Sequence, residues 1–280
     1  MFYLLKSFIQ MKILLNNDDL NEALGNIQNL GFVPTMGSLH KGHISLIKKS
    51  LKECKKTIVS IFVNPKQFDN KKDFKKYPRN SKNDLIILKS LNVPFVYLPT
   101  IREIYNEKRS IQIKLYKKDN VLCAKFRKGH FEGVIDIMDR LTKIIMPNKI
   151  YMGEKDFQQL HLIKKYIQKR YKTKIISCKT IRNKNKLALS SRNLLLKKKD
   201  RIIAEKVAKN LLYFKKNLKV KKNLSKILNS KKNELEKLFN ISIEYLDLRN
   251  INSLKRSNNI VNSKLFIAFY INKVRLIDNF

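Results

Sequence analysis

Short apolar runs alternate with amphipathic stretches over the first two-thirds of this 280-residue chain. Such alternation predicts β-strands separated by α-helices. Because the connections are short, the strands should lie parallel in one sheet that helices cover. The sequence therefore predicts an α/β fold whose ligand site lies beyond the carboxyl ends of the strands. The strands are expected at residues 32–34, 57–63, 93–98, 149–152 and 174–178.

Helices are expected where apolar residues recur with a period of 3.6 and capping residues flank the run. The first helix should begin near Asn17 or Asp18 and stop at Gly31. One further helix has an apolar face made of Val134, Ile137, Met138, Leu141 and Ile145. The remaining helices of this part are expected at residues 44–54, 79–92 and 156–170.

The pattern changes after about residue 180. Two lysine-rich helices are expected at residues 201–217 and 223–239, and strand-like runs follow at 241–248 and 265–270. We therefore expect two domains. Residues 1–180 would form the domain around the parallel sheet, and residues 181–280 would form a smaller α+β domain.

The chain carries 61 Lys and Arg against 22 Asp and Glu, a formal net charge of +39. A charge of this size is typical of nucleic-acid-binding proteins. Its distribution argues otherwise, because lysine dominates and paired lysines recur along the whole chain, from Lys48–Lys49 to Lys231–Lys232. A dedicated surface would cluster its charge and use arginine for two-point contacts with phosphate. We interpret the excess lysine as solvated surface and predict no specific nucleic-acid partner.

Cysteines and hydropathy indicate the compartment. Cys54, Cys123 and Cys178 are far apart and form no CxxC pair, so neither a zinc site nor a disulfide framework is indicated. The apolar stretch at residues 1–15 is interrupted by two lysines and has no small-residue cleavage site, which argues against a signal peptide. No window approaches the ~20 apolar residues that cross a bilayer. We predict a soluble, cytoplasmic protein with reduced thiols, no protein-bound metal and no membrane contact.

The most informative segment is VPTMGSLHKGH, residues 33–43. A strand end is followed by a turn at Gly37 and by a helix that opens with His40 and His43. A spacing of three residues places both imidazoles on one face of the first helical turn. Free backbone N–H groups and the positive end of the helix dipole attract phosphate there. The imidazoles can donate hydrogen bonds to an α-phosphate as charge builds on it, and Gly42 leaves room for a nucleotide against the backbone.

Two simpler interpretations of this histidine pair stay open. The imidazoles could cap the helix, or they could bind a metal ion. A zinc-binding helix would need HExxH spacing and a third ligand, which this segment lacks. The HxGH spacing alone is moderate support for nucleotide binding, whereas the longer PTMGxLHxGH pattern is specific.

Further motifs follow in order along nearly the whole chain. They are VSIFVNPKQF (59–68), YPR (77–79), LC (122–123), RKGHFEGV (127–134), GEKDFQQL (153–160), LALSSRN (187–193) and RLIDN (275–279). Together with PTMGSLHKGH these motifs resemble the pantothenate synthetase (pantoate–β-alanine ligase) family of the HxGH nucleotidyltransferase superfamily. The resemblance implies a Rossmann-like N-terminal domain and a smaller C-terminal lid domain.

The resemblance implies that ATP and pantoate give pantoyl-adenylate and pyrophosphate, and that β-alanine then releases AMP to form pantothenate. His43, His40 and Lys155 would be catalytic, with His43 at the position of the family's proton donor and Lys155 as a mobile charge on the phosphates. Gln67 and Gln159 would hold pantoate through neutral amides. The nucleotide-binding positions would be Met36, Gly37, Ser38, Leu39, His40, Lys41, Gly42, His43, Gly153, Glu154, Lys155, Asp156, Ile181, Leu189, Ser190, Ser191 and Arg192.

The resemblance also implies Mg²⁺ carried on the phosphates of ATP, and a homodimer. Ser190, Ser191 and Arg192 would close over the triphosphate, because two hydroxyls and a guanidinium form a phosphate clamp. His130 is expected to be a structural loop residue. Asp84 would either approach a magnesium-bound phosphate or, as is more usual for a carboxylate at a helix start, complement the helix dipole.

The chain departs from the family pattern at two places. Lys128 stands where the family usually has Pro, and Asn185-Lys186 stand where it has Asp-Gly before Leu187. Loss of that Gly removes the residue best suited to a positive φ. Because Asn185 tolerates such a conformation, we expect a repacked turn and an active enzyme.

Two alternative functions are carried forward. In the first, the chain is another HxGH-type nucleotidyltransferase. In the second, which belongs to a different class of function, it is a basic nucleic-acid-binding protein. Pantoate-dependent ATP–pyrophosphate exchange would separate the first from pantothenate synthesis. Clustered arginine and exposed aromatic residues would favour the second, and neither is evident in the sequence.

Overall fold

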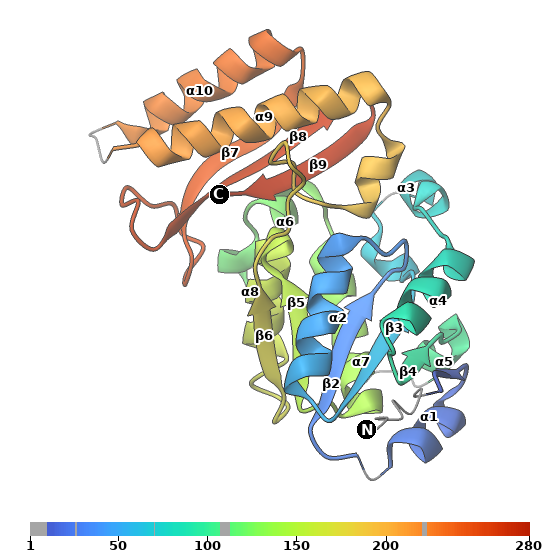
Figure 1. The fold of residues 1–280 in the computed structure, drawn as a ribbon. Coiled ribbons are helices and arrows are strands. Elements are labelled where there is room, and N and C mark those ends of the chain that lie inside the picture. Colours follow the sequence, from blue (N-terminus) through green and yellow to red (C-terminus); the bar gives the residue numbers. More distant parts are fainter. Residues whose placement is uncertain (1–9, 26, 70, 107–112, 220–222) are drawn as a thin grey trace, which may run out of the picture.

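A computed structural model describes residues 10–25, 27–69, 71–106, 113–219 and 223–280. Residues 1–9, which hold most of the apolar N-terminal stretch, lie outside the described part. The chain forms a six-stranded sheet and a separate three-stranded sheet, and the smaller sheet lies beyond one end of the larger one (Figure 1). The predicted α/β fold is confirmed.

Every recorded strand pairing in the larger sheet is parallel. The chain adds β3 and β4 on one side of β2, and β5 and β6 on the other. The topological switch point therefore lies between β2 and β5. In sheet order the strands are β1 (Lys12–Leu14), β4 (Phe95–Tyr97), β3 (Lys56–Ile61), β2 (Leu30–Thr35), β5 (Lys149–Gly153) and β6 (Lys174–Cys178).

The ladder between β2 and β5 is short. It joins only Gly31 to Lys149 and Phe32 to Ile150, although both strands are fully described. The carboxyl ends of these two strands are therefore not joined to each other. In open α/β sheets ligands bind in the crevice that forms at such a point.

Alternate residues of each central strand face opposite sides of the sheet. Val33, Val59 and Tyr151 pack with α2 and α4 on one face. Their neighbours in sequence, such as Phe32 and Ile58, pack with α1, α7 and α8 on the other face. The strands are buried on both sides, which explains why they appear as continuous apolar runs in the sequence.

The helices of this part differ from expectation mainly at their ends. The first helix ends at Leu24 and is followed by Gly25, so the predicted stop at Gly31 was wrong: Gly31 lies within β2. The described helices and 3₁₀ turns are α1 (Asn17–Leu24), α2 (Lys41–Glu53), η1 (Pro65–Gln67), α3 (Lys71–Lys76), α4 (Ser81–Ser90), α5 (Ile101–Tyr105), η2 (Lys117–Asp119), α6 (Cys123–Phe126), α7 (His130–Ile145), η3 (Glu154–Asp156) and α8 (Phe157–Tyr166).

The remaining chain forms the antiparallel sheet β7–β8–β9, with α9 and α10 packed against it (Figure 1). The third strand was not predicted. Its elements are η4 (Ser191–Leu195), α9 (Lys198–Asn217), α10 (Leu224–Phe239), β7 (Ser242–Asn250), β8 (Ser263–Ile271) and β9 (Val274–Asn279). In the part of the chain that the structure describes, no helix combines the length and the apolar character that crossing a membrane requires.

The turn that lacks the family's Gly differs in detail from expectation. Lys186, and not Asn185, takes the left-handed conformation, with φ of 73°. Asn185 instead donates its side-chain amide to Glu205 on α9 at 2.7 Å. The carbonyl oxygen of Lys186 accepts a hydrogen bond from Arg182 at 2.9 Å. The turn is thus held by bonds to its neighbours, which offsets the strain of a left-handed lysine.

Candidate active site

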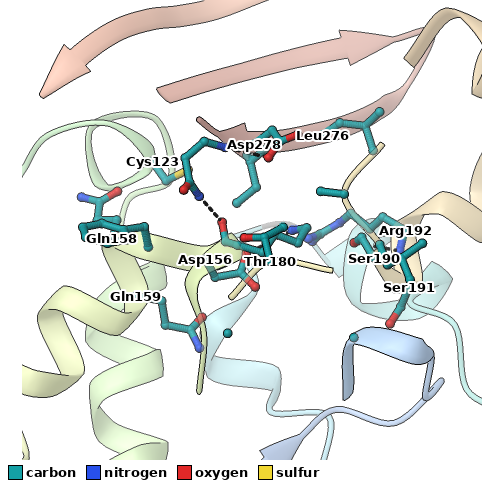
Figure 2. Close-up of a pocket in the computed structure, with 18 of the residues that line it drawn as sticks. Cys123, Asp156, Gln158, Gln159, Thr180, Ser190, Ser191, Arg192, Leu276 and Asp278 are labelled. Carbon is teal, nitrogen blue, oxygen red and sulfur yellow. Dashed lines mark hydrogen bonds and ion pairs between the residues drawn. The ribbon is translucent and has the colours of Figure 1, made fainter. Parts of the chain in front are cut away.

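A cavity of about 270 Å³ opens at the carboxyl ends of the parallel strands, under the antiparallel sheet. Its wall includes the ends of β2 and β5, the starts of α2 and α7, and residues of β9. Figure 2 shows that Gln159 and Asp156 come from one segment, and Ser190 and Arg192 from another that faces it. The cavity therefore lies at the switch point, where the topology predicts a ligand site.

Most of the predicted site residues line this one cavity. The exceptions are Gly37, Ser38, Leu39, Lys41 and Glu154, which are absent from the lining that the described residues form. The lining includes Met36, His40, Gly42, His43, Gln67, Gly153, Lys155, Asp156, Gln159, Ile181, Leu189, Ser190, Ser191 and Arg192.

The two histidines lie together at the start of α2. Their ring centroids are 4.1 Å apart. Nδ1 of His40 accepts the backbone N–H of Gly42 at 3.1 Å, and Nδ1 of His43 accepts that of His40 at 3.4 Å. In the neutral imidazoles the proton therefore sits on Nε2 in both rings. The capping interpretation is thus correct for both histidines, which form a reciprocal capping box, and it leaves both Nε2–H groups available as donors.

Gly42 lines the cavity, and its expected contact with a nucleotide stays a prediction. A Cβ atom at this position would lie 2.7 Å from Cε1 and 2.8 Å from Nδ1 of His40. The missing side chain therefore also makes room for the His40 ring. A side chain here would push the imidazole off the helix start.

Both imidazoles are held neutral near pH 7. Burial and the charge of Lys155 together lower the pKa of His40 to about 4, although the charge of Asp156 acts to raise it. Burial and then the neighbouring His40 lower the pKa of His43 to about 3. In the ligand-free protein these residues are hydrogen-bond donors and not cations.

We expect neither His40 nor His43 to titrate between pH 8 and 5 in the ligand-free protein. The unfolded chain takes up these protons near pH 6.5 while the native state does not, so the free energy of unfolding should fall as pH drops below 6.5. A bound triphosphate analogue should raise both pKa values, because negative charge favours the imidazolium. The measurement is NMR of the imidazole C–H signals against pH, assigned with His→Gln variants. Signals from this pair that titrate near 6.5 without ligand would contradict the account.

The loop between β2 and α2 is held in place by hydrogen bonds to the side chain of Asp84. This carboxylate, on α4 and 1% exposed, accepts the backbone N–H groups of Ser38 and Leu39, each at 2.7 Å. Ser38 adopts a left-handed conformation with φ of 53°. Asp84 therefore holds a strained turn just before the histidines. Its place in the first turn of α4 also fits the expected partnership with the helix dipole, and the expected magnesium contact stays a prediction.

We predict that Asp84→Asn lowers the free energy of unfolding by about 2–3 kcal/mol, because an amide can accept only one of the two buried N–H groups. The looser turn should also raise the KM for ATP. Urea unfolding and steady-state kinetics measure both effects. Asp18→Asn, at an exposed position, is the matched control and should change neither. An unfolding midpoint that stays unchanged in Asp84→Asn would show that this carboxylate does not hold the turn.

Gln67 is held through its backbone by a network that starts at α7. Arg127 makes an ion pair with Asp69 at 3.0 Å and points its Nη1 at Nε2 of His130, 2.9 Å away. Because a guanidinium only donates, Nε2 of His130 accepts, and its Nδ1–H donates to the carbonyl oxygen of Gln67 at 2.5 Å. Burial and Arg127 lower the pKa of His130 to about 3, so the ring is neutral near pH 7 and its two hydrogen bonds set the tautomer. His130 holds neighbouring backbone as a structural residue would, but it begins helix α7, so the predicted position in a loop was wrong.

Helix α7 also touches the turn η1 directly. A Cβ atom on Gly133 would lie 2.2 Å from the carbonyl oxygen of Lys66, so only glycine allows this approach. The side-chain amide of Asn64 donates to the carbonyl oxygen of Gly133 at 3.1 Å. The RKGHFEGV motif thus positions the neighbouring motif that carries Gln67.

Lys155 follows β5 in the turn η3. Its ammonium lies 3.3 Å from the carboxylate of Asp156, and its side chain is 17% exposed. Burial opposes ionisation of Asp156, but the charges of Lys155 and Arg192 outweigh it and lower the pKa of this carboxyl. Glu154 turns away and accepts a hydrogen bond from Ser177 at 2.8 Å. The turn therefore presents one ammonium and one carboxylate to the cavity.

The segment expected to clamp phosphate makes contacts across to the parallel-sheet part. Arg192 pairs with Asp73 on α3 at 2.8 Å, and the Ser191 hydroxyl donates to the carbonyl oxygen of Ser38 at 3.2 Å. Both groups therefore have protein partners in this conformation. A guanidinium has five N–H donors, so Arg192 can bind a phosphate either beside Asp73 or in exchange for it. Asp73 was missed by sequence reasoning, because its partner lies 119 residues away.

Comparison with known proteins extends these observations. The fold and the cavity are those of an α/β protein with a ligand site at its switch point. A family model described as Pantoate-beta-alanine ligase matches residues 12–280. A pantothenate synthetase of Azobacteroides pseudotrichonymphae is 41% identical, over 96% of this chain and 99% of its own, and one of Flavobacterium psychrophilum is 40% identical, over 93% and 94%. The chain belongs to the pantoate–β-alanine ligase family.

Solved structures agree with this membership. The pantoate–β-alanine ligase of Francisella tularensis, crystallised with a β,γ-ATP compound and β-alanine, is 38% identical with a TM-score of 0.82, and the match covers 97% of each chain. The pantothenate synthetase of Thermus thermophilus is 28% identical with a TM-score of 0.89, covering 96% of this chain and 99% of that one.

Proposed function

We propose that this chain condenses pantoate with β-alanine to give pantothenate, consuming ATP and releasing AMP and pyrophosphate through pantoyl-adenylate. The observation that carries the proposal is the shared lining of one cavity at the switch point. There the histidines, Lys155, the two glutamines and the segment 189–192 come together from four motifs. Membership of the pantoate–β-alanine ligase family supports the same conclusion.

In the first step a carboxylate oxygen of pantoate attacks the α-phosphorus of ATP, and pyrophosphate leaves. Negative charge builds on phosphate oxygens. The Nε2–H groups of His40 and His43 and the ammonium of Lys155 are the donors that we assign to this charge. The amides of Gln67 and Gln159 would orient pantoate without an ion pair that would weaken its carboxylate as a nucleophile. Catalysis then comes from positioning and charge stabilisation.

In the second step the amine of β-alanine attacks the acyl carbon, and AMP leaves with its phosphate. The Francisella relative was crystallised with a β,γ-ATP compound and β-alanine, which supports sites for both co-substrates in the present cavity. Gln67 lines the cavity, and we assign it the contact with both pantoate and the incoming amine. No redox or metal-bound intermediate is needed for this step to balance.

Mg²⁺ stays a prediction, and we propose that it enters on the phosphates. Asp156 and Asp278 are the carboxylates among the described lining residues, and each has an ion-pair partner. Arg182 binds both oxygens of Asp278, at 2.6 and 2.8 Å, whereas Lys155 contacts one oxygen of Asp156 at 3.3 Å. Asp156 is therefore the residue that we assign to contact a phosphate-bound ion. One carboxylate with phosphate oxygens is a usual environment for Mg²⁺, whose charge would offset that of the leaving pyrophosphate.

The domain division at residue 180, a lid role for residues 181–280, a homodimer and a cytoplasmic location are part of the proposal. The lid role is supported by contacts such as Arg192–Asp73, which join the two parts over the cavity. Exchange of this ion pair for a phosphate would couple nucleotide binding to movement of segment 189–192.

The experiment that tests the proposal is ATP–pyrophosphate exchange. Labelled pyrophosphate should enter ATP only when pantoate is present, and addition of β-alanine should yield pantothenate and AMP. Exchange without pantoate, or with another acid in its place, would favour a different HxGH enzyme. Binding of RNA that survives moderate salt, without any exchange, would favour the nucleic-acid-binding alternative.

A further inference from the structure

The last strand of the chain reaches the turn that carries Lys155. The Asn279 side-chain amide, on β9, donates to the carbonyl oxygens of Glu154 and Lys155, each at 2.9 Å. Asn279 is 3% exposed. Because both partners are acceptors, the amide nitrogen must face them and the carbonyl oxygen must face away. One side chain thus fixes two consecutive peptide groups of η3 from the antiparallel sheet.

Asn279 is itself held on both sides. The backbone N–H of Asn279 donates to the side chain of Asp278 at 2.7 Å, and its backbone carbonyl oxygen accepts from the guanidinium of Arg182 at 2.9 Å. Arg182 also forms the two-point ion pair with Asp278. Paired guanidinium–carboxylate bonds have restricted geometry, so the end of β9 is a rigid support.

The side-chain oxygen of Asn279 is buried and has no donor among the described residues. A buried acceptor without a partner lowers stability. Packing alone therefore does not explain an asparagine at this position. The two bonds to η3 are what an amide provides here and an apolar residue of similar size would not.

We propose that Asn279 is a positioning residue for Lys155. The proposal rests on the assigned role of Lys155 in the first step. The side-chain amide of Asn279 fixes the backbone of Lys155. The side chain of Lys155 extends into the cavity, where it forms an ion pair with Asp156. The residue that positions the ammonium therefore comes from the last strand of the chain, 124 residues from Lys155. The antiparallel sheet must be docked for Lys155 to be in place.

The test begins with Asn279→Ala and Asn279→Leu in the full chain. Leucine keeps the approximate size of the side chain, cannot donate and buries no charge, so it serves if the alanine variant does not fold. Each should lower kcat for pantoate-dependent exchange about 10- to 100-fold, the effect expected when a catalytic group is misplaced, with little change in the KM for pantoate. Ile271→Val, in the core of the same sheet, is the control for general destabilisation and should keep the wild-type kcat.

A double-mutant cycle with Lys155→Ala separates positioning from a merely structural role. If Asn279 acts through Lys155, its replacement should have almost no further effect on exchange once Lys155 is alanine. An equal loss in both backgrounds, or an unchanged kcat in the folded Asn279 variants, would overturn the inference. The proposed function fails separately: in that case the wild-type chain would show no pantoate-dependent exchange at all.

Discussion

Replacement of Lys155 by alanine is expected to lower the rate of pantoate-dependent ATP–pyrophosphate exchange by about 10²–10³-fold. The ammonium lies in a partly closed cavity, where a charge interacts more strongly with phosphate than in water. It is close enough to His40 and His43 to lower both their pKa values. All three groups would therefore act on one triphosphate, and alanine removes the charged one.

The Lys155 experiment needs a control for the many other lysines. Lys164 lies exposed on α8, the helix that follows η3, and Lys164→Ala should retain normal exchange. Lys155→Arg keeps the charge but not the compact shape of an ammonium, so we expect an intermediate rate. If Lys155→Ala turns over at a near-normal rate, this lysine is not a phosphate ligand.

His43→Ala should reduce adenylate formation by a similar factor of about 10²–10³, because it removes one donor that faces the developing charge. Measurement of the first half-reaction alone, by rapid quench, isolates this effect from product release. The structure adds a sharper comparison. Since His43 is neutral without ligand, its first role is to donate a hydrogen bond from Nε2.

His43→Gln separates this role from proton donation. Glutamine can place an N–H near the position of Nε2 but cannot give up a proton near neutral pH. We expect His43→Gln to be at least about tenfold faster than His43→Ala in the first half-reaction. Equal rates for the two variants would mean that the proton of an imidazolium is required, as the family resemblance implies. A near-normal rate for the alanine variant would remove His43 from the mechanism.

The buried centre of the fold could be predicted from the sequence, but its edges could not. Strand β6 has the predicted limits, and β3 and β5 differ by two residues or fewer, because continuous apolar runs are a strong signal. Strand β1 was missed, since its three residues include two exposed ones. The end of α1 was misplaced although Gly25 offered an earlier stop. Strand β9 mixes charged and apolar residues, and its pairing with β8 decides its structure.

In the site, too, some features could be predicted from the sequence and others could not. Motifs located many residues around the cavity, because VPTMGSLHKGH, VSIFVNPKQF and GEKDFQQL span the carboxyl ends of β2, β3 and β5. Their partners were not predictable, since they join distant segments. Ser191 forms a hydrogen bond with Ser38, 153 residues away in the sequence, and Asn279 forms one with Lys155, 124 residues away. The RLIDN motif at residues 275–279 did mark the end of β9, but nothing local reveals that it supports η3.

The account depends on activation of pantoate at the α-phosphorus of ATP. Pantoate labelled with ¹⁸O in both carboxylate oxygens tests this directly, with mass spectrometry of the products after β-alanine is added. The account predicts one labelled oxygen in AMP and one in the amide of pantothenate. Release of ADP with the label in inorganic phosphate, or of AMP without label, would contradict it.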